Sequence, residues 1–227
     1  MVNAVLERLY RDKEVVHRNG HRKPICPPGL TVERGRYLFD LVRQLRPNLT
    51  LEIGFAYGVS TLHICEALRQ NGRGHHLVID PLERTRFDGL GLRHVEEAGL
   101  SRWMTFHEEP AEYCLPRLIQ DGLRLDFAFD DSGHLFDHVV TEMLFLARLL
   151  RKGALLVVDD VNLPGVARAV DFLVANRADF EDAVTGTGRG MIRRLLDAGV
   201  PPPPAHFRVF RKALDDDPRD WKDFVPF

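Results

Sequence analysis

The sequence contains little cysteine: three residues in a chain of 227, at positions 26, 65 and 114. The number is odd and no CxxC pair occurs, so the pattern indicates neither a disulfide framework nor a zinc site. Cys65 and Cys114 fall within stretches of helical periodicity, where we expect small core residues. Cys26 precedes two prolines in a loop, and we assign it no role.

Long apolar runs and an excess of one charge are also missing. No apolar stretch reaches the length of a membrane span, and the first residues lack the apolar segment of a signal peptide, which predicts a cytoplasmic protein without a membrane partner. The net charge of -2 argues against a nucleic-acid partner, because phosphate binding requires a marked basic excess. Arginines cluster locally at 189, 193 and 194, which we interpret as a solvated face, with contact to an anionic group as the alternative.

Strand-like and helix-like segments alternate from residue 49 onward. Strands are expected at 49–53, 75–80, 104–107, 125–130 and 154–159, followed in turn by helices at 61–69, 90–98, 111–120, 137–150 and 165–176. Two further strands are expected at 180–184 and 207–212. Five strand–helix units predict a mostly parallel α/β sheet of seven strands, doubly wound and covered on both faces. The chain is too short for a (β/α)8 barrel.

The length and the hydrophobic content of 44% suit one α/β domain. Before the alternation come a charged segment with a helical stretch at 3–14, a proline-rich loop at 25–29, and a helix that begins at Thr31 and stops before Pro47. We therefore expect an N-terminal helical cap segment at 1–30 and a single domain at 31–227.

The loop after the first strand, within Leu51–Thr61, reads LEIGFAYGVST. Gly54 and Gly58 allow a tight turn and a close approach to a ligand, at the strand ends where doubly wound folds bind one. The spacing is not the GxGxxG of a diphosphate-binding loop, and Ala56 stands in the middle. Glu52 is an acid in an otherwise apolar strand, placed to bind a ligand amine or a loop N–H. Ser60 is expected to cap the following helix.

The second strand ends at Asp80, where a carboxylate can accept hydrogen bonds from both ribose hydroxyls of an adenosine-containing ligand. Such an acid occurs with several cofactors, so Asp80 alone does not distinguish NAD from S-adenosylmethionine.

Four ordered segments carry a resemblance to the class I methyltransferases, within them to the small bacterial O-methyltransferase-like group. They are LEIGFAYGVST, HLVIDP, LDFAFDDSGH and RKGALLVVDDVN. The resemblance implies S-adenosylmethionine as the cofactor, bound by Glu52, Gly54, Ala56, Tyr57, Gly58, Ser60, Asp80, Ala111 and Asp131. Within this set it implies that Tyr57 and Ser60 line the amino-acid end and that Ala111 contacts the adenine edge. It also implies that residues 25–31 fold over the cofactor, with Thr31 in reach.

The last two segments are also similar to those of catechol O-methyltransferase, which holds Mg²⁺ with an aspartate and an acid–amide pair. The matching positions are Asp131, Asp159 and Asp160. This sequence departs from that relative in having an aspartate in place of the asparagine, and His134 in place of the catalytic lysine.

Chemistry alone supports a cation at these acids. Asp131, Asp159 and Asp160 follow two strands expected to be neighbours, so three carboxylates meet at one edge of the sheet. Like charges raise one another's pKa unless something positive lies between them. A divalent ion such as Mg²⁺, with oxygen ligands, is the natural answer and would lower the pKa of an acceptor hydroxyl. Asn162 is a supplementary ligand candidate.

His134 lies three residues after Asp131 and can accept a proton from an acceptor hydroxyl. His138, one helical turn further, is an alternative base. A lone histidine is more often a structural hydrogen-bond partner, and that interpretation stays open.

The sequence thus predicts an S-adenosylmethionine-dependent methyltransferase acting on a small-molecule hydroxyl with metal assistance. Alternatives are a metal-independent O- or N-methyltransferase using His134, an NAD-binding oxidoreductase, and a non-catalytic binding protein of the same fold. The acceptor pocket is expected from the N-terminal region, the loop after Asp160 and the loop at 185–190. The aromatic tail at 221–227 needs a surface to pack on, either on this subunit or on a partner, and of the two we favour a homodimer.

Overall fold

The computed structural model describes residues 2–25, 29–183 and 189–227. Cys26 and most of the predicted acceptor loop at 185–190 lie outside the described residues. A seven-stranded sheet has the order β5–β4–β3–β6–β7–β9–β8. Its strands are β3 (Leu49–Ile53), β4 (His75–Ile79), β5 (Met104–His107), β6 (Leu125–Asp130), β7 (Leu150–Val158), β8 (Phe180–Asp182) and β9 (Arg208–Lys212).

The first five of these strands run parallel, and β9 is antiparallel to both β7 and β8. The predicted doubly wound, mostly parallel α/β sheet is therefore confirmed. A separate hairpin, β1 (Glu14–Val16) and β2 (Arg22–Pro24), was not predicted.

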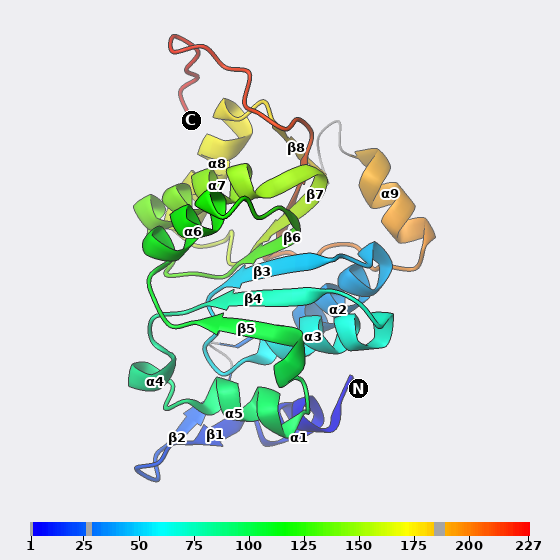
Figure 1. Cartoon of the computed structure of the whole chain (residues 1–227), viewed down its shortest axis with the longest axis vertical. Coiled ribbons are helices and arrows are strands. Elements are labelled where there is room, and N and C mark those ends of the chain that lie inside the picture. Colours follow the sequence, from blue (N-terminus) through cyan, green and yellow to red (C-terminus); the bar gives the residue numbers. More distant parts are fainter. Residues whose placement is uncertain (1, 26–28, 184–188) are drawn as a thin grey trace.

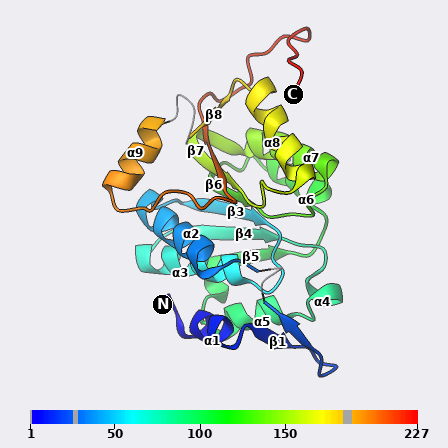
Figure 2. The ribbon, with the colours of Figure 1, turned by 180° about the vertical axis from the view of Figure 1, so that it is seen from behind.

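Helices cover both faces of the sheet (Figures 1 and 2). They are α1 (Ala4–Asp12), α2 (Val32–Leu45), α3 (Val59–Asn71), α4 (Glu83–Arg86), α5 (Leu90–Glu97), α6 (Ala111–Gln120), α7 (Phe136–Leu149), α8 (Pro164–Asn176) and α9 (Arg189–Asp197). A 3-10 turn, Ser101–Trp103, precedes β5. The short helices α4 and α9 were not predicted.

Alternating side chains along the buried strands divide the core into two layers. Phe127 and Phe129 of β6 pack with the helices α1, α2, α3 and α5, whereas Ala128 between them packs with α6, α7 and α8. Cys65 and Cys114 are buried in α3 and α6, as predicted.

The N-terminal segment is packed onto the first of these layers. Leu6 and Leu9 of α1, Val15 of β1 and Leu30 belong to the same apolar cluster as α2 and α3. Asn3 caps α1 by accepting a hydrogen bond from the amide of Leu6 at 3.0 Å. The described residues of this segment thus contribute to the domain core, and the division of the chain at residue 30 stays a prediction.

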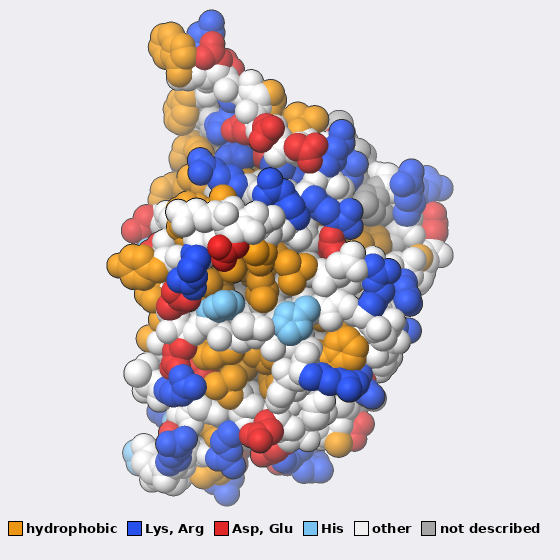
Figure 3. Space-filling model, in the orientation of Figure 1, with side chains coloured by type: hydrophobic (Ala, Val, Ile, Leu, Met, Phe, Trp, Pro, Cys, Tyr) orange, Lys and Arg blue, Asp and Glu red, His pale blue; other side chains and the backbone are white. Residues whose placement is uncertain are grey.

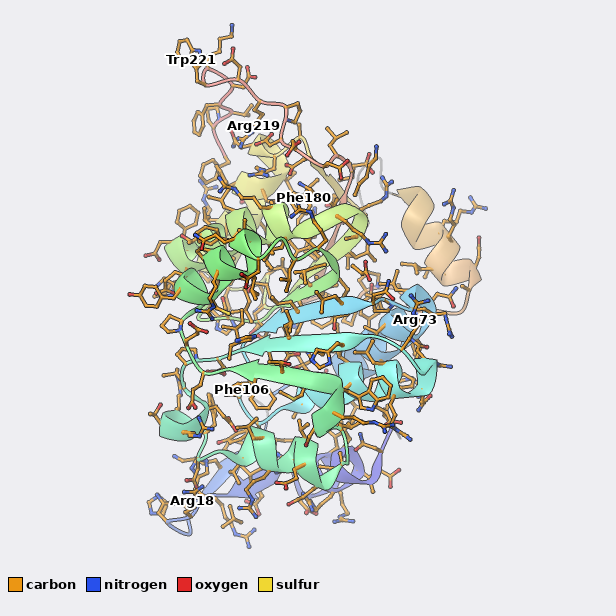
Figure 4. The ribbon with its side chains drawn as sticks, in the orientation of Figure 1. Arg18, Arg73, Phe106, Phe180, Arg219 and Trp221 are labelled. Carbon is orange, nitrogen blue, oxygen red and sulfur yellow. The ribbon has the colours of Figure 1, made fainter. Side chains whose placement is uncertain are left out.

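The C-terminal tail extends from the end of the molecule opposite to α1 and β1–β2 (Figure 1). Phe227 packs within this subunit, against Phe136 and Phe172. Trp221 is 93% exposed and points away from the body of the molecule (Figure 4).

The face shown in Figure 3 carries Lys and Arg side chains interspersed with Asp and Glu. No helix within the described residues is long and apolar enough to cross a membrane.

Candidate active site

A cavity of about 530 Å³ lies at the carboxyl ends of β3, β4, β6 and β7, whose arrowheads mark that edge in Figure 1. Its lining includes the residue that follows each strand: Gly54, Asp80, Asp131 and Asp159. The strand order reverses between β3 and β6, which is where doubly wound sheets bind ligands. The volume is within the range of small-molecule sites.

Gly54 allows the loops that follow β3 and β6 to lie close together at the cavity. Its φ is +94°, and a Cβ at this position would lie 2.0 Å from the carbonyl oxygen of Asp131. Any side chain here would push apart the loops that follow β3 and β6, which explains the glycine. Ala56, two residues on, also lines the cavity and has a φ of +47°, uncommon for a residue with a side chain.

Asp80 holds the loop after β3 in this shape. One carboxylate oxygen accepts from the amides of Phe55 at 2.8 Å and Ala56 at 3.0 Å, and the other accepts from the amide of Leu82 at 2.7 Å. A carboxylate has about four lone-pair positions, so one position remains for a ligand hydroxyl. The predicted ribose contact is thus restricted to the remaining lone pair, because the loop uses the others.

Glu52 lies beneath the cavity and does not line it. It is fully buried, and its carboxylate accepts hydrogen bonds from the hydroxyls of Ser60 and Thr61 and contacts His76 Nε2 at 3.1 Å. These contacts join the start of α3 to β3 and β4 through Glu52, and its contact with the cofactor stays a prediction.

Two other predicted cofactor residues lie behind the cavity wall. The Tyr57 hydroxyl lies 3.0 Å from His17 Nε2, and its carbonyl accepts from His94 Nδ1 at 2.9 Å. Gly58 is the N-terminal cap of α3, with a φ of +77°. Neither residue is among those lining the cavity. Sequence spacing alone cannot tell the inner face of a turn from its outer face.

Ser60 and Ala111 do line the cavity. The Ser60 hydroxyl donates to Glu52 at 3.3 Å and does not cap α3, a correction to the predicted cap. Gly29 and Leu30 line the cavity from the N-terminal side, whereas the folding of residues 25–31 over the cofactor stays a prediction. Thr31 is outside the lining, and its hydroxyl accepts from the amide of Arg34 at 3.3 Å, which caps α2.

The three predicted acids stand side by side at the opposite wall. The amide of Asp131 donates to the carbonyl of Ile53, and the amide of Asp159 donates to the carbonyl of Asp130, both at 2.9 Å. These hydrogen bonds extend the sheet by one step beyond β6 and β7. Asp159 is followed by Asp160 in a turn with a φ of +51°.

His134 lies between two of these acids. Its Nε2 is 3.4 Å from Asp131 Oδ1 and 3.3 Å from Asp160 Oδ2. The hydrogen bond to Asp131 and the neighbouring carboxylates raise the pKa of His134. Its φ of +59° is uncommon, and the loop is held by Gly165, where a Cβ would lie 2.6 Å from the His134 carbonyl oxygen.

Arg34 completes the cluster, and the sequence did not predict it. Its Nη1 donates to both oxygens of Asp159 at 2.7 Å and to Asp160 Oδ1 at 3.1 Å. Asp159 is 1% exposed and Arg34 14%. Burial raises the pKa of Asp159, and the Arg34 guanidinium opposes that shift. A single arginine on an amphipathic helix resembles any solvated arginine, so no local signal distinguishes it.

The donor set differs from the predicted magnesium site. Within the described residues, the ligand atoms that come within 4.8 Å of one another here belong to Asp131, His134 and Asp160, and not to Asp159. Mg²⁺ prefers oxygen ligands, and one of these three donors is a nitrogen. The remaining carboxylate is engaged by Arg34. These residues therefore do not offer Mg²⁺ the three carboxylates that the sequence suggested.

Other predicted candidates lie nearby. His138 lines the same cavity. The side chain of Asn162 lies 2.6 Å from Nδ1 of His206, and that nitrogen is 3.9 Å from Asp160 Oδ1. Asn162 therefore reaches the acids only through His206, which was not predicted.

Part of this chain is similar in sequence to known methyltransferases. Residues 51–161 match the family described as a methyltransferase domain. Rhamnosyl O-methyltransferase of Mycobacterium tuberculosis (strain H37Rv) is 31% identical over 135 residues, which cover 56% of this chain and 51% of that protein. Caffeoyl-CoA O-methyltransferase 2 of Petunia hybrida is 29% identical over 133 residues, covering 57% and 52%. The chain thus spans about half the length of the curated relatives it matches.

The fold agrees over more of the chain. The O-methyltransferase TomG of Streptomyces achromogenes, solved in complex with SAM, superposes with a TM-score of 0.69 at 21% identity, covering 93% of this chain and 90% of that one. The matched segment 51–161 contains the loop after β3, Asp80, His134 and all three acids. Residues 51–161 thus match a methyltransferase domain, and the chain has the fold of this solved methyltransferase.

Proposed function

We propose that the chain transfers a methyl group from S-adenosylmethionine to a hydroxyl of a small molecule. The observation that carries this proposal is that a single cavity is lined both by the loop after β3 and by the cluster of Asp131, His134 and Asp160. The first wall is suited to a nucleoside-linked amino acid, and the second to a hydroxyl that must lose a proton.

The residues of the first wall divide the cofactor between them. The Gly54–Ala56 loop faces its amino-acid and ribose parts, the remaining lone pair of Asp80 accepts from a ribose hydroxyl, and Ala111 borders the adenine. When bound, S-adenosylmethionine supplies an electrophilic methyl group, whose bond to sulfur breaks with the electron pair left on sulfur as the acceptor oxygen bonds to carbon.

His134 takes the proton of the acceptor hydroxyl. Nε2 faces Asp131 and Asp160 at 3.4 and 3.3 Å, so the tautomer with a proton on Nε2 donates to them. The nitrogen left to accept a proton is Nδ1, which has no hydrogen-bond partner among the described residues. The two acids then stabilise the imidazolium, and the rest of the reaction depends on in-line positioning.

The similar O-methyltransferases indicate the chemical class of the acceptor. Their names specify a rhamnosyl group and a caffeoyl thioester, which have in common only a methylated oxygen. We propose a small molecule carrying a sugar or phenol hydroxyl. A cytoplasmic location and a homodimer stay predictions. The exposed Trp221 supports the second, although Phe227 already packs within this subunit.

A metal-assisted version of the reaction rests on one observation: the ligand atoms of Asp131, His134 and Asp160 lie within 4.8 Å of one another. It would require a cation next to Arg34. The metal-independent version, with His134 as base, needs no rearrangement of these contacts, and we favour it.

The test has two stages. Calorimetric titration with S-adenosylhomocysteine, and with NAD⁺ as the control, should show saturable binding of the first alone. Transfer of labelled methyl from S-adenosylmethionine to a panel of sugar and phenol hydroxyls should then identify an acceptor. Binding of NAD⁺ without binding of S-adenosylhomocysteine would overturn the proposal, and binding of the cofactor with no transfer to any hydroxyl would refute its second part.

A further inference from the structure

Arg34 is a permanent cation inside an acidic cluster. Its guanidinium contacts two of the three carboxylates through one nitrogen, with Nη1 at 2.7 Å from both oxygens of Asp159 and at 3.1 Å from Asp160. The Arg34 side chain also lines the cavity. The space that a divalent ion would need between these two acids is thus taken by a group of the protein itself.

The position of Arg34 is fixed by its helix. Thr31 caps α2 through the amide of Arg34. The next residue, Gly35, lies so close to α3 that a Cβ would come within 2.3 Å of His63 Nε2. Tyr37 and Leu38 are buried in the core on the same helix. The guanidinium therefore projects from a rigid element, which favours a preorganised role.

The hydrogen bonds of the Arg34 side chain leave donors unused. Within the part of the chain that the structure describes, all of them come from Nη1. A guanidinium has five N–H groups in a planar fork, so Nε and Nη2 keep theirs for a ligand. Since the side chain lines the cavity, these donors are available to an anionic oxygen there.

From this geometry we infer that Arg34 takes the place of the divalent cation at this site. Its positive charge compensates part of the negative charge of Asp159 and Asp160. It also presents Nε or Nη2 to the acceptor oxygen as that oxygen loses its proton. The inference rests on the proposed function, because it assumes a hydroxyl acceptor. It assigns a role to a residue of α2, outside the segment matched by the methyltransferase family. A guanidinium cannot be removed by a chelator, so the reaction should need no metal.

The decisive probe is Mn²⁺ alone, titrated by calorimetry into the wild-type chain and into Arg34→Gln, Arg34→Lys and Arg36→Gln. Arg36 is the matched control because it lies on the same helix and pairs with Asp40 at the surface, at 2.9 Å. The wild type, Arg34→Lys and Arg36→Gln should show no saturable heat. Arg34→Gln should show saturable binding of Mn²⁺, at least about tenfold tighter than the weakest affinity that the wild-type titration could detect, since three close carboxylates then lack their cation.

Turnover should agree with these titrations. The wild type should be equally active with excess chelator and with added Mg²⁺, whereas Arg34→Gln should lose at least about tenfold in turnover, as expected on removing a charge-stabilising donor. Arg34→Lys should fall in between, because a lysine keeps the charge and loses the fork.

Tight Mn²⁺ binding by the wild type that is abolished in Asp160→Asn would overturn the inference, as would loss of wild-type turnover in chelator. If Arg34→Gln does not fold, the wild-type and Arg34→Lys titrations still decide the question. Failure of the proposed function gives a different result, namely no binding of S-adenosylhomocysteine to the wild type whatever Mn²⁺ does.

Discussion

Two charge clusters in this chain contain similar residue types and differ in what they do. The structural cluster consists of Arg177, Asp179, Lys212 and Asp217, and the site cluster of Arg34, Asp131, His134, Asp159 and Asp160. In the structural cluster, Asp179 accepts from Arg177 at 2.8 and 2.7 Å and from Lys212, and Arg177 also lies 3.4 Å from Asp217. Asp179 is 0% exposed and Lys212 1%.

The clusters differ in their charge balance and in what they face. In the structural cluster each acid is paired with a cation, Asp217 also with Arg219 at 2.6 Å, and none of these residues lines the cavity. The site cluster sets three acids against one permanent cation, and all its members line the cavity. An excess of negative charge that faces a cavity attracts a cationic ligand such as a sulfonium. A cluster away from the cavity whose acids are all paired with cations joins chain segments.

Backbone conformation separates the clusters in the same way. His134 and Asp160, together with Ala56 across the cavity, have a positive φ, and no member of the structural cluster does. Such conformations persist where the surroundings impose them, and they concentrate at functional sites.

The largest effect is expected in the structural cluster. Asp179→Asn leaves Lys212 buried without a negative partner, so the free energy of unfolding should fall by about 3 kcal/mol. Affinity for S-adenosylhomocysteine should stay unchanged. Chemical denaturation and calorimetry measure the two quantities. Glu181→Ala is the control, because its pair with Arg211 is partly exposed and worth less than about 1 kcal/mol. Equal losses in both variants would contradict a special role for Asp179.

In the site cluster, the same kind of substitution should affect turnover and not stability. His134→Ala should lower turnover about a hundredfold or more, as for removal of a general base, with cofactor affinity nearly unchanged. The measurement is initial rates with an acceptor identified by the methyl-transfer panel.

His138→Ala is the matched control for this variant, since His138 lines the same cavity. It should keep most of the turnover. If His138→Ala is the inactive variant and His134→Ala the active one, the assignment of the base is wrong and belongs to His138.

A smaller effect is expected at the joint between the two cavity walls. Gly54→Ala places a Cβ against the carbonyl of Asp131 and requires a backbone strained by about 1–3 kcal/mol, so affinity for S-adenosylhomocysteine should fall roughly tenfold or more. Gly72→Ala is the control: its φ is also positive, at +67°, but nothing lies within 4 Å of a Cβ there. Both variants should lose stability, and only Gly54→Ala should lose affinity.

The contrast between the clusters also explains what the sequence could predict. The parallel strands and the acids at their ends follow from periodicity and from the rule that ligands bind at carboxyl ends, so Asp80, Asp131, Asp159 and Asp160 were placed at the correct edge. Glu52, Tyr57 and Gly58 do not line the cavity, because a strand or a turn has two faces and spacing does not reveal which one meets the cavity. Their contact with the cofactor stays a prediction.

Arg34 could not be predicted for a different reason. It reaches Asp159 across 125 positions of sequence. Local periodicity describes its helix correctly but says nothing about which helix end meets which strand end. The same holds for Lys212 and Asp179, which pair across 33 positions. Long-range charge pairs of this kind are decided by packing, and the sequence alone shows only their separate halves.

The smallest effect should come from Asp217, the more exposed acid of the structural cluster. Asp217→Asn leaves Arg177 and Lys212 against Asp179 alone and removes an acidic partner of Arg219, so that the cluster carries an excess of cations where the site carries an excess of acids. Asp217 is 20% exposed, lies 3.4 Å from Arg177, and pairs at 2.6 Å with Arg219, which is itself 26% exposed. Water can therefore replace its carboxylate, and the free energy of unfolding should fall by about 1 kcal/mol or less. Chemical denaturation beside Asp179→Asn gives the comparison. A loss as large as that of Asp179→Asn would mean that charge count, and not burial of the individual acid, governs the stability of such clusters, and the same count would then apply to Asp159 and Asp160 around Arg34.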